Sequence, residues 1–120
     1  MESFNISAQQ MIKLINQYID EERIYGIIDQ KDQMFYYISY EMREKILSKI
    51  QNEGILKVAD LATMLDMSSE IAIKVIYKLI SQFQIKGSFS QTKKFYYTQK
   101  YIMDHLIKEI NKQGIINLGT

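Results

Sequence analysis

The 120-residue chain contains no cysteine, no proline and no tryptophan, and it has one histidine and five glycines. Without cysteine it can form neither disulfides, nor thiolate metal sites, nor thioester intermediates. Without proline no helix is broken by that residue, so we expect a continuous and mostly helical chain. The absence of cysteine also makes an intracellular protein the natural expectation, and we predict a cytoplasmic location.

The net charge is small as well, and the chain has no long apolar run. Fifteen basic and fourteen acidic side chains leave a net charge of +1, so no global field draws the chain to nucleic acid or to an anionic membrane. No apolar run approaches the length of a membrane span, and the start MESFNIS lacks the basic and apolar regions of a signal peptide. The 47% of hydrophobic residues suffices for the core of one modest domain or of two very small ones.

An internal repeat is the most informative feature that is present. The triplet Phe-Tyr-Tyr occurs at 35–37 and again at 95–97. An offset of 61 aligns residues 6–26 with residues 67–87, whereas an offset of 60 aligns the two triplets. We attribute this change of offset to hairpin loops of unequal length. The chain is therefore predicted to contain one supersecondary unit more than once.

Local patterns predict the elements of this unit. Apolar residues at helical spacing predict five helices, at 7–22, 41–52, 59–66, 68–82 and 100–112. Short β-rich runs with a polar centre predict two hairpins and a separate short strand, at 23–39, 84–98 and 55–58. Gly54 follows the second helix, where a left-handed C-terminal residue is expected.

From Glu41 onward, the order helix, short strand, helix, helix, hairpin is typical of a winged helix-turn-helix. We predict a mainly α protein with small β-hairpin wings. One complete copy spans 41–100, a partial copy at 1–40 has a helix and a wing, and 101–120 holds a helix and the start of a further repeat. Alternation along each wing strand is expected to turn the first and third aromatics of the triplet toward the helices and to leave Tyr36 and Tyr96 half exposed.

A helix and a hairpin alone cannot bury both of their faces. Leaving large apolar side chains of the first copy in water would cost about 1.5 to 3 kcal/mol each. Three segments could cover them: the complete copy of the same chain, the C-terminal piece of this or another chain, or a different protein.

Catalytic and metal sites have little support in the sequence. His105 is the only histidine, and no partner residues stand at characteristic spacing from it. The glycines are isolated and do not form a phosphate-binding loop. We therefore expect no enzymatic activity, no metal and no cofactor.

DNA binding is the alternative function, since winged helices commonly place their third helix in the major groove. The residues available for it are Lys74 and Lys78 on that helix and Lys93 and Lys94 on the wing. The helix carries no arginine for bidentate base reading, and its first turn carries Glu70. Nucleic acid is therefore the less favoured partner.

The stretch ISYEMREKILSKIQNEGILKVADLATMLDMSSEIAIKVIYKLI, followed by IKGSFSQTKKFYYT, resembles the tandem winged helices of the ufmylation ligase and its DDRGK-domain partner, and more loosely the winged-helix half of PCI domains. The shared features are the apolar pattern from Gly54 to Ala62, which ends in Leu-Ala, and the Ile-x-Gly-x-hydrophobic pattern from Ile85 to Phe89. The acidic-arginine signature of the DDRGK partner is absent, which favours the ligase side.

The resemblance implies a scaffold. In that family, partial winged helices of two proteins complete one another, and the ligase holds a conjugating enzyme near its substrate without a catalytic cysteine. The implied partners are a second partial winged-helix protein, a conjugating enzyme or another copy of the chain. The residues expected at the partner-binding face are Met11, Ile12, Ile15, Tyr18, Ile19 and Tyr36.

Overall fold

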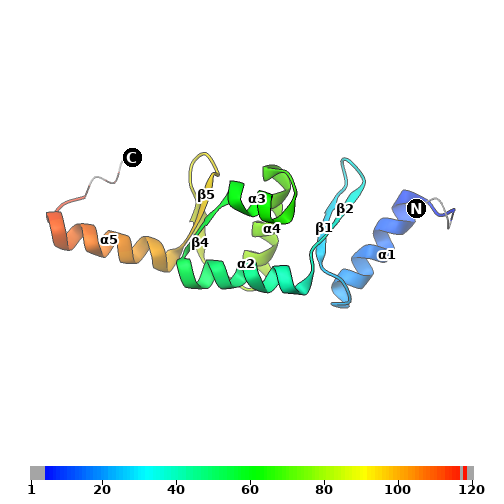
Figure 1. Ribbon diagram of the computed structural model, residues 1–120, viewed down its shortest axis with the longest axis horizontal. Coiled ribbons are helices and arrows are strands. Elements are labelled where there is room, and N and C mark those ends of the chain that lie inside the picture. Colours follow the sequence, from blue (N-terminus) through cyan, green and yellow to red (C-terminus); the bar gives the residue numbers. More distant parts are fainter. Residues whose placement is uncertain (1–4, 117, 119–120) are drawn as a thin grey trace. The chain divides into compact units, whose positions relative to one another are not determined.

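The computed structural model describes residues 5–116 and 118, and within them the protein is mainly helical with two small antiparallel sheets (Figure 1). The helices and strands are α1 (Ala8–Asp20), β1 (Gly26–Asp29), β2 (Met34–Tyr37), α2 (Tyr40–Glu53), β3 (Ile55–Lys57), α3 (Val58–Leu65), α4 (Ser69–Gln82), β4 (Gly87–Phe89), β5 (Phe95–Thr98) and α5 (Gln99–Gln113). The predicted helices, hairpins and short strand are confirmed, with ends that differ by at most three residues.

The chain divides into two compact units, and the division falls inside α2, between Lys45 and Ile46. The first unit contains α1, the β1–β2 hairpin and the first residues of α2. The second unit contains the rest of α2 and all later elements.

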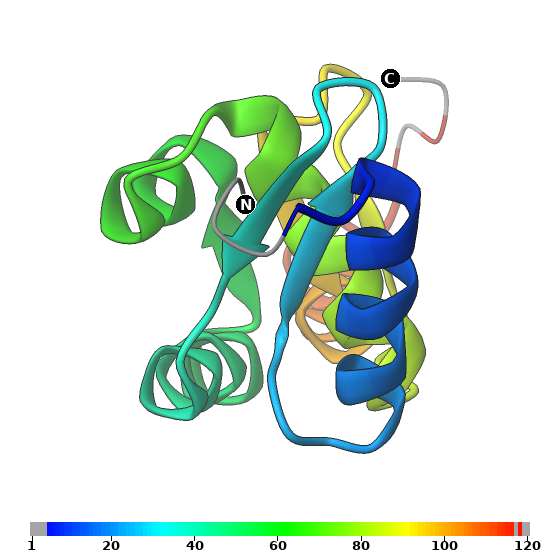
Figure 2. The same cartoon turned by 90° about the vertical axis from the view of Figure 1, so that its right-hand side faces the viewer.

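In the first unit α1 lies along the β1–β2 hairpin (Figure 2). Ser7 caps the helix by accepting a hydrogen bond from the Gln10 backbone N–H, and the Gln10 side chain accepts one from the Ser7 N–H. This reciprocal pair satisfies two N–H groups that a helix start leaves open. The predicted capping box is confirmed.

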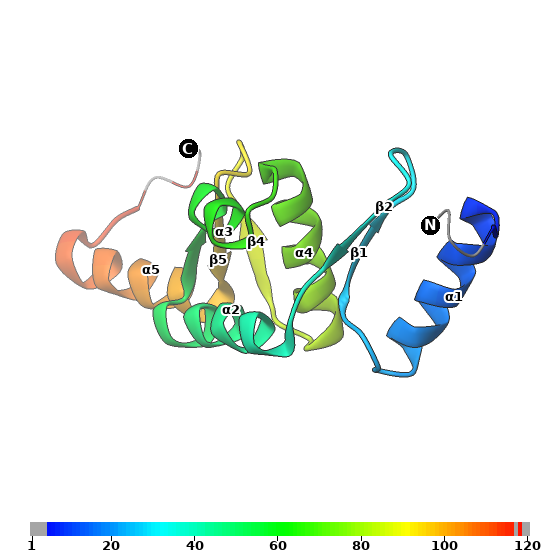
Figure 3. The same ribbon diagram turned by 45° about the vertical axis from the view of Figure 1, so that its right-hand side comes forward.

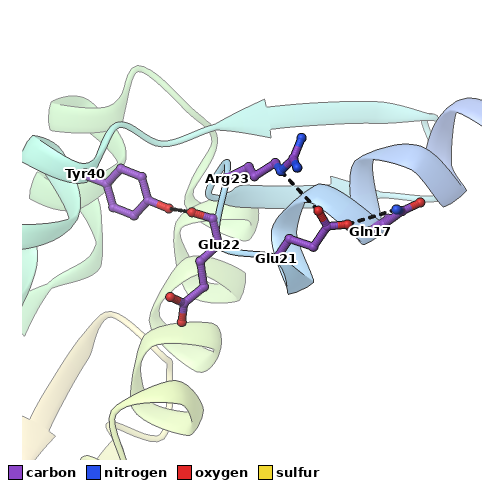
Figure 4. Close-up of polar contacts among 5 residues, drawn as sticks. All are labelled: Gln17, Glu21, Glu22, Arg23 and Tyr40. Atoms are coloured by element: carbon purple, nitrogen blue, oxygen red, sulfur yellow. Dashed lines mark hydrogen bonds and ion pairs between the residues drawn. The ribbon is translucent and has the colours of Figure 1, made fainter.

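The turn after α1 is held by polar contacts (Figure 4). The Glu21 carboxylate accepts a hydrogen bond from the Gln17 side chain at 2.9 Å and pairs with the Arg23 guanidinium at 3.1 Å. Glu22 adopts a left-handed backbone with φ of 60°, and its carbonyl accepts a hydrogen bond from the Tyr40 hydroxyl. These contacts set the direction in which the chain leaves the helix and enters the hairpin.

In the second unit a three-stranded sheet, ordered β3-β5-β4, lies beside α3 and α4. Ser68 caps α4 by accepting from the Ile71 N–H, and Asp66 ends α3 in a left-handed conformation. The core is made of side chains that are at most 6% exposed, from α2, β3, α3, α4 and β5: Ile46, Leu47, Ile50, Leu56, Val58, Leu61, Ile71, Ala72, Val75, Ile76, Leu79 and Tyr96.

The two hairpins share one hydrogen-bonding register at a constant offset of 61 residues. At their open ends Gly26 lies opposite Tyr37, and Gly87 lies opposite Thr98. The turns are equally long, because the same offset relates the residues that close them. The prediction of unequal hairpin loops is therefore wrong, and the two Phe-Tyr-Tyr triplets lie one residue out of structural register.

The constant offset makes Phe35 equivalent to Tyr96 rather than to Phe95. The glycine that opens each hairpin supports this equivalence, because Gly26 lies against the Phe35 ring and Gly87 lies against the Tyr96 ring. A side chain at either glycine would overlap that ring.

The predicted orientation is wrong for the second aromatic triplet and for Tyr37 of the first, whereas Phe35 faces α1 and Tyr36 is half-buried, as predicted. Tyr96 is only 1% exposed and meets the Phe89 ring at 5.1 Å, so the middle aromatic of the second triplet faces the core. Phe95 and Tyr97 stack on each other at 6.0 Å on the opposite face of the strand. In the first hairpin Tyr37, predicted to face the helix, is 58% exposed.

Candidate protein-interaction site

The offset of 61 also makes α1 the counterpart of α4, but the two helices differ in burial. None of the 13 residues of α1 is buried, whereas α4 buries five. Val75 and Leu79 of α4 are 0% exposed, and their equivalents Leu14 and Tyr18 are 40% and 38% exposed. Among residues 5–45, the described part of the first unit, there are no counterparts of the elements that cover α4 in the second unit. One apolar face of α1 therefore meets water.

One side of α1 does contact its own hairpin. Met11, Ile12 and Ile15 line a small cavity of about 230 Å³, together with Ile28 and Phe35 from the two strands. All five side chains are half-buried. Three of the predicted partner-binding residues thus lie where α1 meets the hairpin.

The rest of the apolar surface of α1 lies beside this cavity. Leu14 is not among the predicted site residues, although it lies four residues before the predicted Tyr18 and therefore on the same side of the helix. The Arg23 guanidinium lies 5.6 Å from the centre of the Tyr18 ring, which places a cation over an exposed aromatic. Ile19 is half-buried. Leu14 and Tyr18 provide the most accessible apolar area of the helix.

The β1–β2 sheet of the first unit has an open strand edge. In the second unit β5 lies between β3 and β4, but its counterpart β2 pairs only with β1 in the part of the chain that the structure describes. Tyr36 lies at the middle of β2, opposite Ile27, and is half-buried. An unpaired row of backbone N–H and C=O groups is a ready template for an added strand.

The C-terminal helix presents a second exposed apolar surface. Like α1, it has no buried residue, and Figure 3 shows it continuing from β5. Its exposed apolar side chains, between 39% and 49% accessible, are Ile102, Met103, Ile107 and Ile110. A groove of about 470 Å³, which shares Ile102 with this set, runs along the helix and is lined by Tyr97, Tyr101, Ile102, His105, Leu106, Glu109, Gln113 and Ile116.

Aromatic rings form one wall of that groove. Tyr97 stacks on Tyr101 at 5.8 Å, and Tyr101 stacks on His105 at 4.6 Å. The sole histidine is therefore part of an aromatic stack, and no group of three potential metal ligands occurs among residues 5–116 and 118.

The four lysines considered for DNA binding do not form one cluster. Lys93 and Lys94 line a cavity of about 440 Å³ with Lys57 and Ser69, at the start of α4. The Lys93 ammonium lies 5.8 Å from the centre of the Tyr77 ring. Lys74 and Lys78 lie further along α4 and do not line this cavity. The basic surface is thus divided between the wing tip and the body of the helix.

Two buried tyrosines have perturbed acidity. Burial raises the pKa of Tyr25 to about 12, and the nearby Arg43 guanidinium opposes this shift in part. That guanidinium lies 5.1 Å from the centre of the Tyr25 ring and 4.6 Å from that of Tyr40. Burial also raises the pKa of Tyr96, whose hydroxyl has no hydrogen-bond partner. These groups are neutral near pH 7 and act as apolar core elements.

None of the helices in the described residues is both long enough and apolar enough to cross a membrane. Comparison with models of known protein families and with curated proteins finds no match to this chain.

Proposed function

We propose that this protein is a non-catalytic interaction module in which partial winged-helix units are completed by a partner. The observation that carries the proposal is the contrast between α1, with no buried residue, and its equivalent α4, with five. The order of elements in the second unit and its β3-β5-β4 sheet support the winged-helix assignment. The proposal assigns the partner to the face that Leu14 and Tyr18 share with the edge of β2.

The proposed setting is a cytoplasmic scaffold in a ubiquitin-like modifier ligase complex of the ufmylation type. This part of the proposal is supported by the resemblance of residues 38–80 and 85–98 to the tandem winged helices of that ligase. A scaffold of this kind needs no catalytic cysteine, and the chain has none. Its contribution is to hold other proteins close together.

The energetic reason for a partner is the exposed apolar area. Leu14 and Tyr18 keep about two fifths of their surface in water, so complete burial would stabilise the protein by roughly 1 kcal/mol for each. Backbone hydrogen bonds along the β2 edge would also fix the orientation of the partner strand. A few central anchors of this type typically dominate an interface.

The second candidate function is DNA binding by the second unit, favoured by the three lysines around the cavity at the start of α4. Against it, Glu70 lies in the first turn of that helix, and both arginines of the chain, Arg23 and Arg43, precede the second unit. Binding of this kind would be non-specific and strongly dependent on salt.

The test is a titration of the full chain with purified DDRGK-domain protein, followed by sedimentation. We expect a complex that Leu14→Asp abolishes and Asn16→Asp retains. Both variants add one negative charge to α1, but Asn16 lies on its exposed polar side. Leu14 is a cleaner position than Ile15, because Ile15 lines the unit's own cavity.

The proposal fails if Leu14→Asp and Asn16→Asp behave alike in this titration. Duplex DNA serves as the comparison ligand. Tight, salt-dependent duplex binding that weakens on Lys74→Ala or Lys78→Ala, without any complex with the protein partner, would establish the second candidate instead.

A further inference from the structure

We infer that the α1 face and the β2 edge are covered by α5 and residues 115–116 of a second copy of this chain, arranged head to tail. This inference rests on the proposed function, because it names the protein that completes the first unit. Below, the head is the surface formed by α1 and β2, and the tail is α5 with Ile115 and Ile116.

The internal repeat identifies α5 as a copy of α2. A hydroxyl caps the start of each helix, since the Ser39 side chain accepts from the Met42 N–H and the Thr98 side chain accepts from the Tyr101 N–H. Each helix is followed by a glycine in the left-handed region, with φ of 71° and 75°, and then by two large aliphatic residues. These glycines are Gly54 and Gly114. The tail therefore carries the same helix and glycine turn as the beginning of the complete unit, followed by two aliphatic residues like those that begin β3.

Equivalent residues of α2 and α5 differ in burial. Leu47 and Ile50 of α2 are 6% and 1% exposed, and their equivalents Ile107 and Ile110 are 49% and 48% exposed. In the second unit the apolar face of α2 is buried in the same core as the apolar face of α4. Helix α1 is the counterpart of α4, and α5 is the counterpart of α2. The exposed faces of the head and the tail therefore correspond to the two helix faces that are buried together in the core of the second unit.

The strand edges agree with this pairing. In the second unit Ile55 of β3 lies opposite Tyr97 of β5, and the Thr98 N–H donates to the Gly54 carbonyl at 2.9 Å. The corresponding head-to-tail register places Ile115 opposite Tyr36 of the second copy. Ile115 is 79% exposed, so its side chain is available for such a contact. The added strand would turn the two-stranded sheet of the head into the three-stranded sheet of the complete unit.

The net charges of the two units favour a contact between a head and a tail. Met1–Lys45 carries five basic and eight acidic side chains, a net charge of −3, and Ile46–Thr120 carries ten basic and six acidic ones, a net charge of +4. Asp20 ends α1 and is followed by Glu21 and Glu22, whereas α5 carries Lys100, Lys108 and Lys112 against two acidic residues, Asp104 and Glu109. Head-to-head pairing would bring like charges together, so the long-range field selects head-to-tail docking.

A contact between two different surfaces leaves one head and one tail free at the ends of every open assembly. Assemblies therefore grow with concentration or close into a ring. Blocking one end of each chain should limit growth to a dimer.

The first experiment uses one variant blocked at the head and one blocked at the tail, Leu14→Asp and Ile110→Asp. Each is expected to remain at the monomer mass of 14.2 kDa by light scattering, and a mixture of the two is expected to form a dimer of twice that mass. The matched controls Asn16→Asp and Asn111→Asp add the same charge at exposed polar positions of the same helices and should assemble as the parent chain does.

The second experiment uses the absence of cysteine. Residues 55 and 97 are a pair without mutual backbone hydrogen bonds, a position where Cβ atoms are close enough for a disulfide. A mixture of Tyr36→Cys and Ile115→Cys chains is therefore expected to give a disulfide-linked heterodimer under oxidation. Tyr37→Cys mixed with Ile115→Cys is the control, because side chains one residue apart point to opposite faces.

Three outcomes would overturn the inference. These are a parent chain that stays monomeric at all concentrations, a head-blocked and tail-blocked mixture that stays monomeric, and a double variant, Tyr36→Cys with Ile115→Cys, that forms only an intrachain disulfide. If any of these occurs while Leu14→Asp still abolishes binding of the DDRGK-domain protein, the proposed function stands and only the identity of the occupant is wrong. If Leu14→Asp has no effect on either association, both fail.

Discussion

Helices α1 and α4 begin in the same way and end in different environments. Both have a serine cap, and 61 residues separate every equivalent pair. Yet the positions of Val75 and Leu79, fully buried in α4, are taken in α1 by side chains that are about 40% exposed. The comparison teaches that the local sequence forms the helix, whereas its burial depends on elements that, in the part of the chain that the structure describes, only the second unit has.

The largest expected difference comes from the same substitution at equivalent positions. Ile76→Ala removes a side chain that is 0% exposed and should lower the free energy of unfolding of the second unit by about 2 to 5 kcal/mol. Ile15→Ala, at the equivalent half-buried position, should cost less than about 1.5 kcal/mol in the dilute chain. Urea unfolding followed by residue-resolved NMR measures both. Equal losses would mean that α1 is as well covered as α4.

The two helix-ending glycines provide the next comparison. Both have positive φ, so alanine at either position should cost about 1 kcal/mol in backbone strain. A Cβ at Gly54 would also lie 2.8 Å from the Tyr101 Cβ, whereas one at Gly114 would meet no atom within 4 Å. We therefore expect Gly54→Ala to lower the melting temperature clearly more than Gly114→Ala, as measured by circular dichroism. The reverse order would contradict the assignment of Gly114 to an uncovered copy.

Removing either serine cap should lower local stability by the same amount, so the two caps are the control for the comparison of α1 with α4. Ser7→Ala and Ser68→Ala each remove one side-chain hydrogen bond to a helix N–H. Each should cost about 1 kcal/mol of local stability, which amide hydrogen exchange in the first turn can measure. A much larger effect at Ser68 would show that the cap, and not only burial, distinguishes the two helices.

The smallest effect near neutral pH concerns Tyr25. Its pKa is raised from 10.0 to about 12, so the folded chain holds this proton more tightly than the unfolded chain does. The resulting stability is fully present below pH 10 and is lost as the pH rises through about 12. Tyrosinate absorbance should show a late titration step that Tyr25→Phe removes. A titration unchanged by that substitution would contradict the assignment.

Much of the fold could be predicted because its signals are local. Ser7 followed by Gln10 predicted the start of α1, and Gly54 predicted the end of α2. The register of the hairpins could not be derived from matching letters, since Phe35 corresponds to Tyr96 rather than to Phe95. Strand pairing follows backbone hydrogen bonds, and a similarity of aromatic letters one residue out of register misassigns the buried face.

The candidate site shows the same division. The apolar spacing of α1 was enough to select Met11, Ile12, Ile15, Tyr18 and Ile19, but it could not separate the three that meet the hairpin from Tyr18, which meets water. Leu14 was missed, although it has the same helical spacing, because its importance lies in its exposure. Exposure is a property of the neighbours that a side chain has in space, which periodicity does not report.

The sequence alone determined the helices, the hairpins, the repeat and the absence of thiol chemistry, because capping, periodicity and composition act over a few residues. Only the tertiary structure decided which faces stay uncovered and that, within the described residues, β2 lacks the strand that its counterpart β5 has. Burial and strand pairing join residues far apart in the chain. Equivalent sequences therefore end in different environments when one of them lacks the segments that would surround it.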